Sequence, residues 1–138
     1  MIKESIGFLL GAASRSSKRI FDQTVRKYDI TAVQWAVLKY LEEEGAKQQT
    51  QIADELYMDK ASVGTIIEKL MKKELIEREV SEEDRRAYQV RLTENAYGVV
   101  EEITPVAVQI NEESCGDMSP GERLMLMELL QKIIDNLN

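Results

Sequence analysis

The sequence predicts a single, mainly α-helical domain with a small β-ribbon, and three observations favour this class. The chain has 138 residues, 43% of them hydrophobic, so one buried core fits but two independent domains hardly do. Apolar residues recur at intervals of three and four along most of the chain, which is typical of amphipathic helices. Between residues 76 and 92 the period changes to two, which is typical of strands.

The first two helices follow from this periodicity and from signals at the helix ends. One long amphipathic helix is expected from about residue 2 to residue 27. Thr31 followed by Gln34 is a capping-box pattern, in which two side chains satisfy free backbone N–H groups at a helix start. A second helix is therefore expected to begin there and to end near Glu44, because Gly45 stops it.

Two short helices and a ribbon come next. Only Tyr57 and Met58 separate a helix at about 49–57 from a helix that begins at the N-cap Asp59, and so short a turn makes the two cross at a large angle. The alternating segments 76–80 and 88–92 predict two antiparallel strands joined by the charged loop 81–87. This order predicts a winged helix-turn-helix over about residues 30–93.

Two more helices complete the chain. Thr93 is expected to cap the first, which Pro105 should kink or break. Ser119 and Glu122 form a second capping box with proline at the first helical position, and this last helix reaches about Leu137.

The helices at both ends carry more apolar residues than one small lobe can cover. The last helix is apolar around most of its circumference between residues 124 and 137. Self-association is the economical way to bury that surface. We therefore predict that residues 1–29 and 94–138 are dimerisation helices within one domain that spans residues 1–138.

Composition narrows the chemistry that the chain can perform. It contains no histidine and one cysteine, Cys115. Without histidine, Ser-His-Asp and Cys-His mechanisms lack their base, and most metal sites lose a common ligand. We expect a protein that is not an enzyme and that holds neither a metal nor a cofactor.

Other features favour a cytoplasmic protein without a membrane partner. A lone thiol suits a reducing compartment. The chain has no run of about 20 apolar residues, which a membrane-spanning helix needs. Its first residues lack the basic stretch and apolar block of a secretion signal.

The net charge of −7 is not spread evenly along the chain. Residues 1–58 hold 8 basic and 8 acidic side chains, residues 59–93 hold 8 and 8, and residues 94–138 hold 2 and 9. All of the excess acidity therefore lies in the last third. A local basic surface can still face phosphate, because exposed charges beyond about 10 Å are largely screened at 0.1 M salt.

The helix-turn-helix followed by a ribbon predicts an interface for duplex DNA. The second short helix is expected to enter the major groove, where Ser62 and Thr65 contact bases, while Gly64 marks a close approach. Arg85 and Arg86 at the ribbon tip suit a narrow minor groove. The alternative for the helix residues is an ordinary solvated helix face. The alternative for the two arginines is an ordinary surface turn.

With this layout the sequence resembles the MarR family of bacterial regulators over nearly its whole length. The most specific stretch is residues 84–93, Asp-Arg-Arg-Ala-Tyr-Gln-Val-Arg-Leu-Thr, which looks like the wing signature of that family. The matching segments Thr31 to Leu38, Gln51 to Ala53 and Asp59 to Val63 support it. The early segments look most like the SlyA-type branch.

The resemblance implies a triangular homodimer with intertwined terminal helices, which binds a pseudo-palindromic operator, is expected to repress, and is released by a phenolic or lipophilic anion. By match to the motifs, the DNA-binding residues are Lys60, Ser62, Thr65, Lys69, Asp84, Arg85 and Arg86. Many members carry an arginine where this chain has Gly64 and Thr65, so the base preference does not carry over. Peroxide-sensing members use a cysteine near the N-terminus. The one cysteine here, Cys115, lies near the other end of the chain, which argues against redox sensing by that mechanism.

A small aromatic or lipophilic effector is expected in a cleft between the DNA-binding lobe and the dimer helices. The candidates to line it are Phe8, Trp35, Leu38 and Tyr40, and for each the alternative is plain core packing. Bound there, the effector would favour a spacing of the two recognition helices that mismatches the operator. The alternative function is a winged-helix protein that acts through protein contacts of its acidic C-terminal third, without binding DNA.

Overall fold

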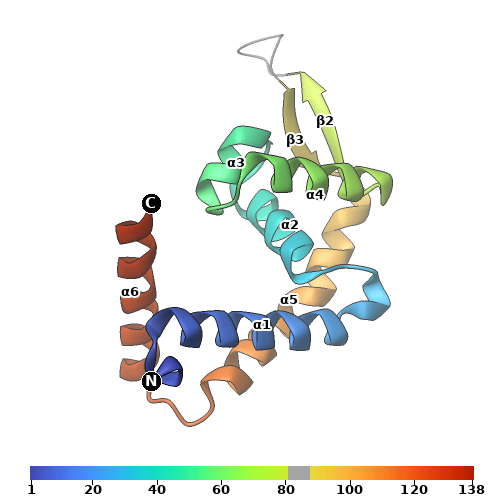
Figure 1. Cartoon of the computed structure of the whole chain (residues 1–138). Helices are drawn as coiled ribbons and strands as arrows, with labels where there is room; N and C mark the ends of the chain where they lie inside the picture. Colours follow the sequence, from blue (N-terminus) through green and yellow to red (C-terminus); the bar gives the residue numbers. More distant parts are fainter. Residues whose placement is uncertain (81–87) are drawn as a thin grey trace.

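The computed structural model describes residues 1–80 and 88–138, which form six α-helices, two short 3-10 helices and three strands (Figure 1). In chain order these are η1 (Ile2–Glu4), α1 (Ile6–Thr24), η2 (Arg26–Tyr28), α2 (Ala32–Glu44), β1 (Lys47–Gln48), α3 (Gln49–Glu55), α4 (Lys60–Lys72), β2 (Ile76–Val80), β3 (Tyr88–Leu92), α5 (Glu94–Cys115) and α6 (Pro120–Leu137). The predicted fold class, mainly α with a small β-ribbon, is confirmed.

The long first helix predicted over residues 2–27 is wrong at both ends. Ser5 has an extended backbone, and its hydroxyl accepts from the N–H of Phe8 at 3.4 Å, so α1 begins only after it. A side-chain oxygen that captures a backbone N–H competes with helix continuation. Beyond Val25 the helix tightens into the 3-10 helix η2. Asp29 ends this segment, and its φ of 56° is left-handed.

The helix-start signals of α2 and α6 are confirmed. Thr31 and Gln34 bond reciprocally, with both backbone-to-side-chain distances at 3.2 Å, and Ser119 and Glu122 do the same at the start of α6. Gly45 follows α2 with a φ of 79°, a conformation that a side chain would oppose.

The helix-turn-helix is formed by α3 and α4. The turn closes through Tyr57, whose φ is 54°, and the N–H of Met58 donates to the carbonyl of Ala53 at 2.9 Å. Asp59 caps α4, because its carboxylate accepts from the backbone N–H of Ser62 at 2.8 Å and from the Ser62 hydroxyl at 2.6 Å. These two hydrogen bonds lower the pKa of the Asp59 carboxyl.

The sheet is antiparallel in the order β1-β3-β2, and the predicted ribbon is its β2–β3 pair, with Ile76 opposite Leu92 and Val80 opposite Tyr88. The strand β1 was not predicted, because two residues are too few to show a period. It pairs with β3 through Lys47 and Val90. Figure 1 shows the ribbon extending away from the helices.

Two details of α5 differ from the prediction. The helix runs unbroken through Pro105. The carbonyl of Glu101, which loses its N–H partner to proline, lies on the exposed side of the helix where water can replace the bond. Thr93 stands at the N-cap, but its hydroxyl does not cap the helix and instead donates to the carbonyl of Glu74 at 2.7 Å.

The core lies where α2, α4 and α5 meet the sheet. Among its fully buried side chains are Val37 and Leu38 of α2, Ile67 of α4 and Ile103 of α5. Residues 1–29 and 94–138, predicted to form the dimer region, contain α1, α5 and α6. Figure 1 shows α1 crossing α5 low in the molecule, with α6 standing beside them.

We predict that Leu38→Ala lowers the free energy of unfolding by about 2–5 kcal/mol, because it leaves a cavity in a packed core. Urea unfolding followed by circular dichroism measures this change. Glu43→Ala, at an exposed position of the same helix, is the control and should stay within about 0.5 kcal/mol of the wild type. An equally small effect at Leu38 would contradict its placement.

We predict that Asp59→Ala destabilises the fold in a pH-dependent way. The pKa of Asp59 is lowered in the folded state, so its carboxylate stabilises the fold above the unfolded pKa of about 3.9 and this contribution is lost as the pH falls through the lower folded pKa. Unfolding curves from pH 7 downward should therefore show the wild type and the variant converging in acid. A difference that does not change with pH would count against the cap.

Candidate nucleic-acid interface

The outward face of α4 is polar and exposed. Val63, Ile67 and Leu70 are fully buried on the opposite side of the helix. The four helix residues predicted to bind DNA are all exposed: Lys60, Ser62, Thr65 and Lys69. At 100° per residue, Ser62, Thr65 and Lys69 point away from the buried side of α4, and the structure brings these three side chains together on one surface. Lys60, seven positions before the buried Ile67, stands apart from them at the first position of the helix.

The two hydroxyls on this face already have partners within the helix. The Ser62 hydroxyl bonds to Asp59, and the Thr65 hydroxyl donates to the carbonyl of Ala61 at 3.2 Å. A hydroxyl that donates in this way still has lone pairs free to accept. Ser62 and Thr65 can therefore accept hydrogen bonds from base edges without losing their contacts to the helix.

Gly64 lies where α4 approaches the start of α3. A side-chain carbon at this position would come within 3.1 Å of the amide nitrogen of the Gln49 side chain. The close approach predicted for Gly64 is confirmed, and the neighbour is part of the protein.

An ion pair joins α4 to the ribbon. Arg78 of β2 donates to Glu68 on the outward side of α4 at 2.8 Å. No local pattern in the sequence predicts this pair, because its members belong to different elements and meet only in the folded chain. The contact links the ribbon to α4 and pairs the charge of an acid on the outward side of the helix.

A second ion-pair group crosses the ribbon itself. Arg91 of β3 lies 2.7 Å from Glu77 and 2.9 Å from Glu79, both on β2. The hydrogen bond to Glu77 is the main reason that the pKa of Arg91 is raised. These contacts link the two strands toward the Ile76–Leu92 end of the ribbon. The predicted wing residues Asp84, Arg85 and Arg86 lie outside the described residues.

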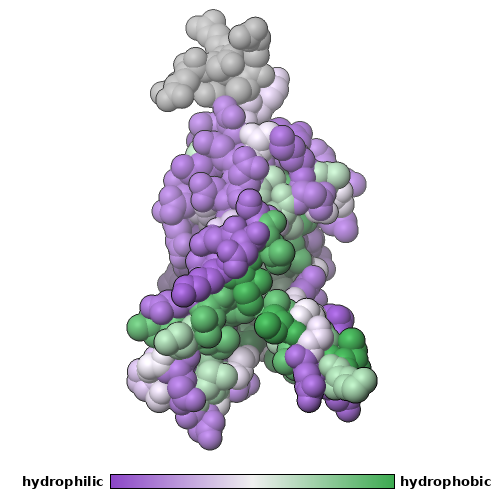
Figure 2. All heavy atoms as spheres, turned by 60° about the vertical axis from the view of Figure 1, so that its left-hand side comes forward, coloured by the Kyte–Doolittle hydropathy of each residue, from purple (hydrophilic) through white to green (hydrophobic). Residues whose placement is uncertain are grey.

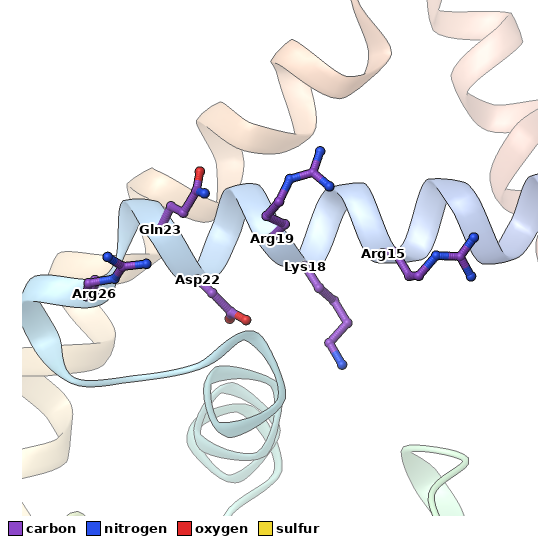
Figure 3. Close-up of a pocket in the computed structure, with 6 residues that line it drawn as sticks. All are labelled: Arg15, Lys18, Arg19, Asp22, Gln23 and Arg26. Carbon is purple, nitrogen blue, oxygen red and sulfur yellow. The ribbon is translucent and has the colours of Figure 1, made fainter.

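An open cavity of about 500 Å³ lies between α1, the start of α2 and α4. Its lining includes Lys18 of α1, Thr31 and Gln34 at the start of α2, and Ser62 and Lys69 of α4. A shallower groove of about 380 Å³ continues along α1. Figure 3 shows its residues, which are Arg15, Lys18, Arg19, Asp22, Gln23 and Arg26.

The structure does not bring the predicted effector residues into one cleft. Leu38 is fully buried, and Tyr40, two positions and about 200° further around α2, cannot face the same side. Tyr40 is half-buried, and its burial, together with the charges of Glu55 and Glu44, raises the pKa of its hydroxyl. Trp35 packs against Phe21, with ring centres 6.1 Å apart.

Phe8 lies on α1 and is 38% exposed. None of these four predicted residues lines the cavity or the groove described above. Their role in binding an effector stays a prediction.

In residues 1–80 and 88–138, no group of three or more cysteine or acidic side chains is placed to hold a metal ion. Across the same described ranges, no helix is both long enough and apolar enough to span a membrane.

Comparisons with known proteins agree with this geometry. Residues 30–88 match the MarR family. The chain is 32% identical over 135 residues to the transcriptional repressor NicR of Pseudomonas putida, and the match covers 98% of this chain and 85% of NicR. It is 28% identical to the transcriptional regulator MhqR of Bacillus subtilis, with 91% and 86% coverage.

Solved structures show the same fold. BpsR of Bordetella bronchiseptica, described in terms of the regulation of its DNA binding by 6-hydroxynicotinic acid, superposes with a TM-score of 0.91 at 33% identity, covering 98% of this chain and 96% of BpsR. The Staphylococcus aureus MepR–DNA complex superposes with a TM-score of 0.89 at 24% identity, covering 100% of this chain and 100% of MepR, and supports the fold alone.

These relatives are transcriptional regulators and not enzymes. A helix-turn-helix with an exposed polar helix, a ribbon tied to it by an ion pair, and a match over nearly the full length together identify the chain as a member of the MarR family of DNA-binding transcriptional regulators.

Proposed function

We propose that this protein is a repressor that binds a pseudo-palindromic operator as a homodimer and releases it when a small aromatic anion binds. In this proposal, residues 30–93 form the DNA-binding lobe, and residues 1–29 and 94–138 form the dimer region. The assignment to a SlyA-like branch remains a prediction.

The observation that carries the proposal is the two-sided character of α4. One side of the helix is fixed in the core by Val63, Ile67 and Leu70, and the other presents small polar and basic side chains. A helix whose exposed side chains are small can lie deep in the major groove. Lys60 and Lys69, near its two ends, are suited to the phosphates on either side.

The surface of the chain supports a dimer. A monomer of 15.8 kDa is expected to expose about 7,300 Å², whereas this chain exposes 9698 Å². The extended ribbon contributes to the difference of about 2,400 Å². Permanent homodimers bury about 1,000–2,500 Å² from each subunit, so the excess is of the size that a partner copy would cover.

The exposed apolar side chains concentrate in the predicted dimer region. Within the described chain, α6 has no buried residue, and its Leu124, Met127 and Leu129 are 54%, 62% and 47% exposed. Ile6 and Leu9 of α1 are 66% and 51% exposed. Figure 2 shows this hydrophobic surface on the lower half of the molecule, away from the polar upper half. A symmetric partner would bury it and place two copies of α4 on one side of a duplex.

The cavity and the groove on α1 are the proposed effector site. The volume of about 500 Å³ suits a small ring compound, and the groove contributes the cations of Arg15, Lys18, Arg19 and Arg26. The one carboxylate there, Asp22, is occupied in accepting from the N–H of Ala32 at 2.6 Å. An aromatic carboxylate fits these charges, and the relative BpsR is regulated by one.

The position of the cavity gives a direct way to release DNA. Ser62, Thr65 and Lys69 line it and also form the outward face of α4. A ligand that contacts them therefore competes for the side chains that the duplex needs, or shifts the helix that carries them. Either effect gives the ligand a different affinity for the free and DNA-bound states, which release requires.

We predict that Lys69→Ala weakens binding to all duplexes and lowers the slope of log affinity against log salt by about 0.9, because one phosphate contact is lost. Fluorescence anisotropy with fragments selected from genomic DNA, titrated at several salt concentrations, measures both quantities. Lys3→Ala removes the same charge from the exposed N-terminal η1 and is the matched control.

A wild-type protein that binds no duplex at low salt would reject the proposed function and favour the alternative of a winged-helix protein that contacts other proteins. A variant of Lys69 that keeps the wild-type slope would reject only the role of this residue.

We predict that 6-hydroxynicotinic acid lowers the DNA affinity of the wild type, and that Lys18→Gln raises the concentration needed by about threefold to tenfold, because an exposed cation contributes modestly to anion binding. The same anisotropy assay gives the half-effective concentration. Nicotinamide, which has a related ring but no carboxylate, is the ligand control and should act far more weakly. Equal potency of the two compounds would refute a site that selects anions.

A further inference from the structure

The C-terminal end of α4 is held by Lys73, the residue at which the helix ends. Its ammonium donates to the backbone carbonyl of Asp29 and, at 3.0 Å, to the side-chain oxygen of Gln34. The carboxylate of Asp29 lies 3.7 Å away. Oxygens from the junction between α1 and α2 therefore surround a group that has three donors to satisfy.

The Gln34 acceptor at this junction is also held by contacts that do not involve Lys73. Gln34 is 5% exposed and is the one buried polar side chain in the described ranges. Its oxygen also accepts from the N–H of Thr31 in the capping box. The Asp29 carboxylate is 91% exposed, so solvent screens its charge, and the two hydrogen bonds are the main contact.

The same junction is tied to α1. The N–H of Ala32 donates to the carboxylate of Asp22 at 2.6 Å, so α1, the start of α2 and the end of α4 are joined within a few residues. Since α1 belongs to the proposed dimer region, Lys73 connects the recognition helix to the part of the chain that would set its distance from the partner's recognition helix.

The chain beyond Lys73 has a separate anchor. The hydroxyl and the N–H of Thr93 bond to the carbonyls of Glu74 and Leu75 at 2.7 and 3.0 Å. Without Lys73, α4 would keep this anchor and its buried face, and would lose only the tie toward α1. The expected consequence is a change in the orientation of the helix, with the lobe still folded.

We propose that Lys73 is a positioning residue for operator recognition, which fixes the orientation of α4 against α1 and thereby the spacing of the two recognition helices in the dimer. This inference rests on the proposed function, because it requires α4 to bind DNA in a symmetric dimer.

The test compares Lys73→Met with Lys72→Met and Lys73→Arg. Lys72 is the exposed neighbour and makes none of these contacts, so its variant removes the same charge from the same helix end. Affinity is measured for the selected operator and for the same duplex with one base pair inserted between its half-sites. Lys73→Met should reduce the preference for the correct spacing by about fivefold or more. Lys72→Met should weaken both duplexes alike, and Lys73→Arg should restore the preference.

Hydrogen exchange gives a second readout that needs no DNA. Lys73→Met should speed amide exchange in residues 31–35 and 69–75 and leave α5 unchanged, whereas Lys72→Met should not. If the wild type ignores the spacing or binds no duplex, the proposed function fails and this inference fails with it. The other outcome is that the wild type prefers the correctly spaced duplex while Lys73→Met shows the same spacing preference and the same exchange rates as Lys72→Met. In that case this inference alone is overturned.

Discussion

Burial of one face of α4 is the constraint on which the rest of the structure depends. Val63, Ile67 and Leu70 are removed from water on the side of α4 that packs against α2, α3 and β2, and this burial fixes the rotation of the helix about its own axis. The polar side chains are turned outward as a consequence. The rotation that the proposed interface with DNA needs is therefore a product of core packing.

Contacts around α4 then set its remaining degrees of freedom. The N-terminal end is capped by Asp59, the outward side is tied to the ribbon through Glu68 and Arg78, and the C-terminal end is tied to the α1–α2 junction through Lys73. All three contacts are polar and lie at the edge of the core. Such contacts contribute modestly to stability but restrict geometry strongly, which suits a helix that must match a groove.

The order of the elements and the sites of capping could be predicted from the sequence, because these depend on periodicity and on short-range hydrogen bonds. The start of α1 was mispredicted because a single hydroxyl, that of Ser5, outweighed a favourable apolar pattern. Thr93 was misjudged for a related reason, since its hydroxyl found a tertiary acceptor in Glu74. The exposed polar side of α4 followed from helical periodicity, whereas the predicted effector residues do not line the cavity between α1, α2 and α4. A cavity depends on how α1 and α4 approach each other, and no local pattern encodes that approach.

The central claim is that two copies of α4, related by symmetry, bind one face of a duplex. Hydroxyl-radical footprinting of the wild type on a selected operator tests this claim most directly. Two protected patches with centres about 10–10.5 base pairs apart, or a multiple of that distance, are expected. A single protected patch, or protection without a helical repeat, would contradict it.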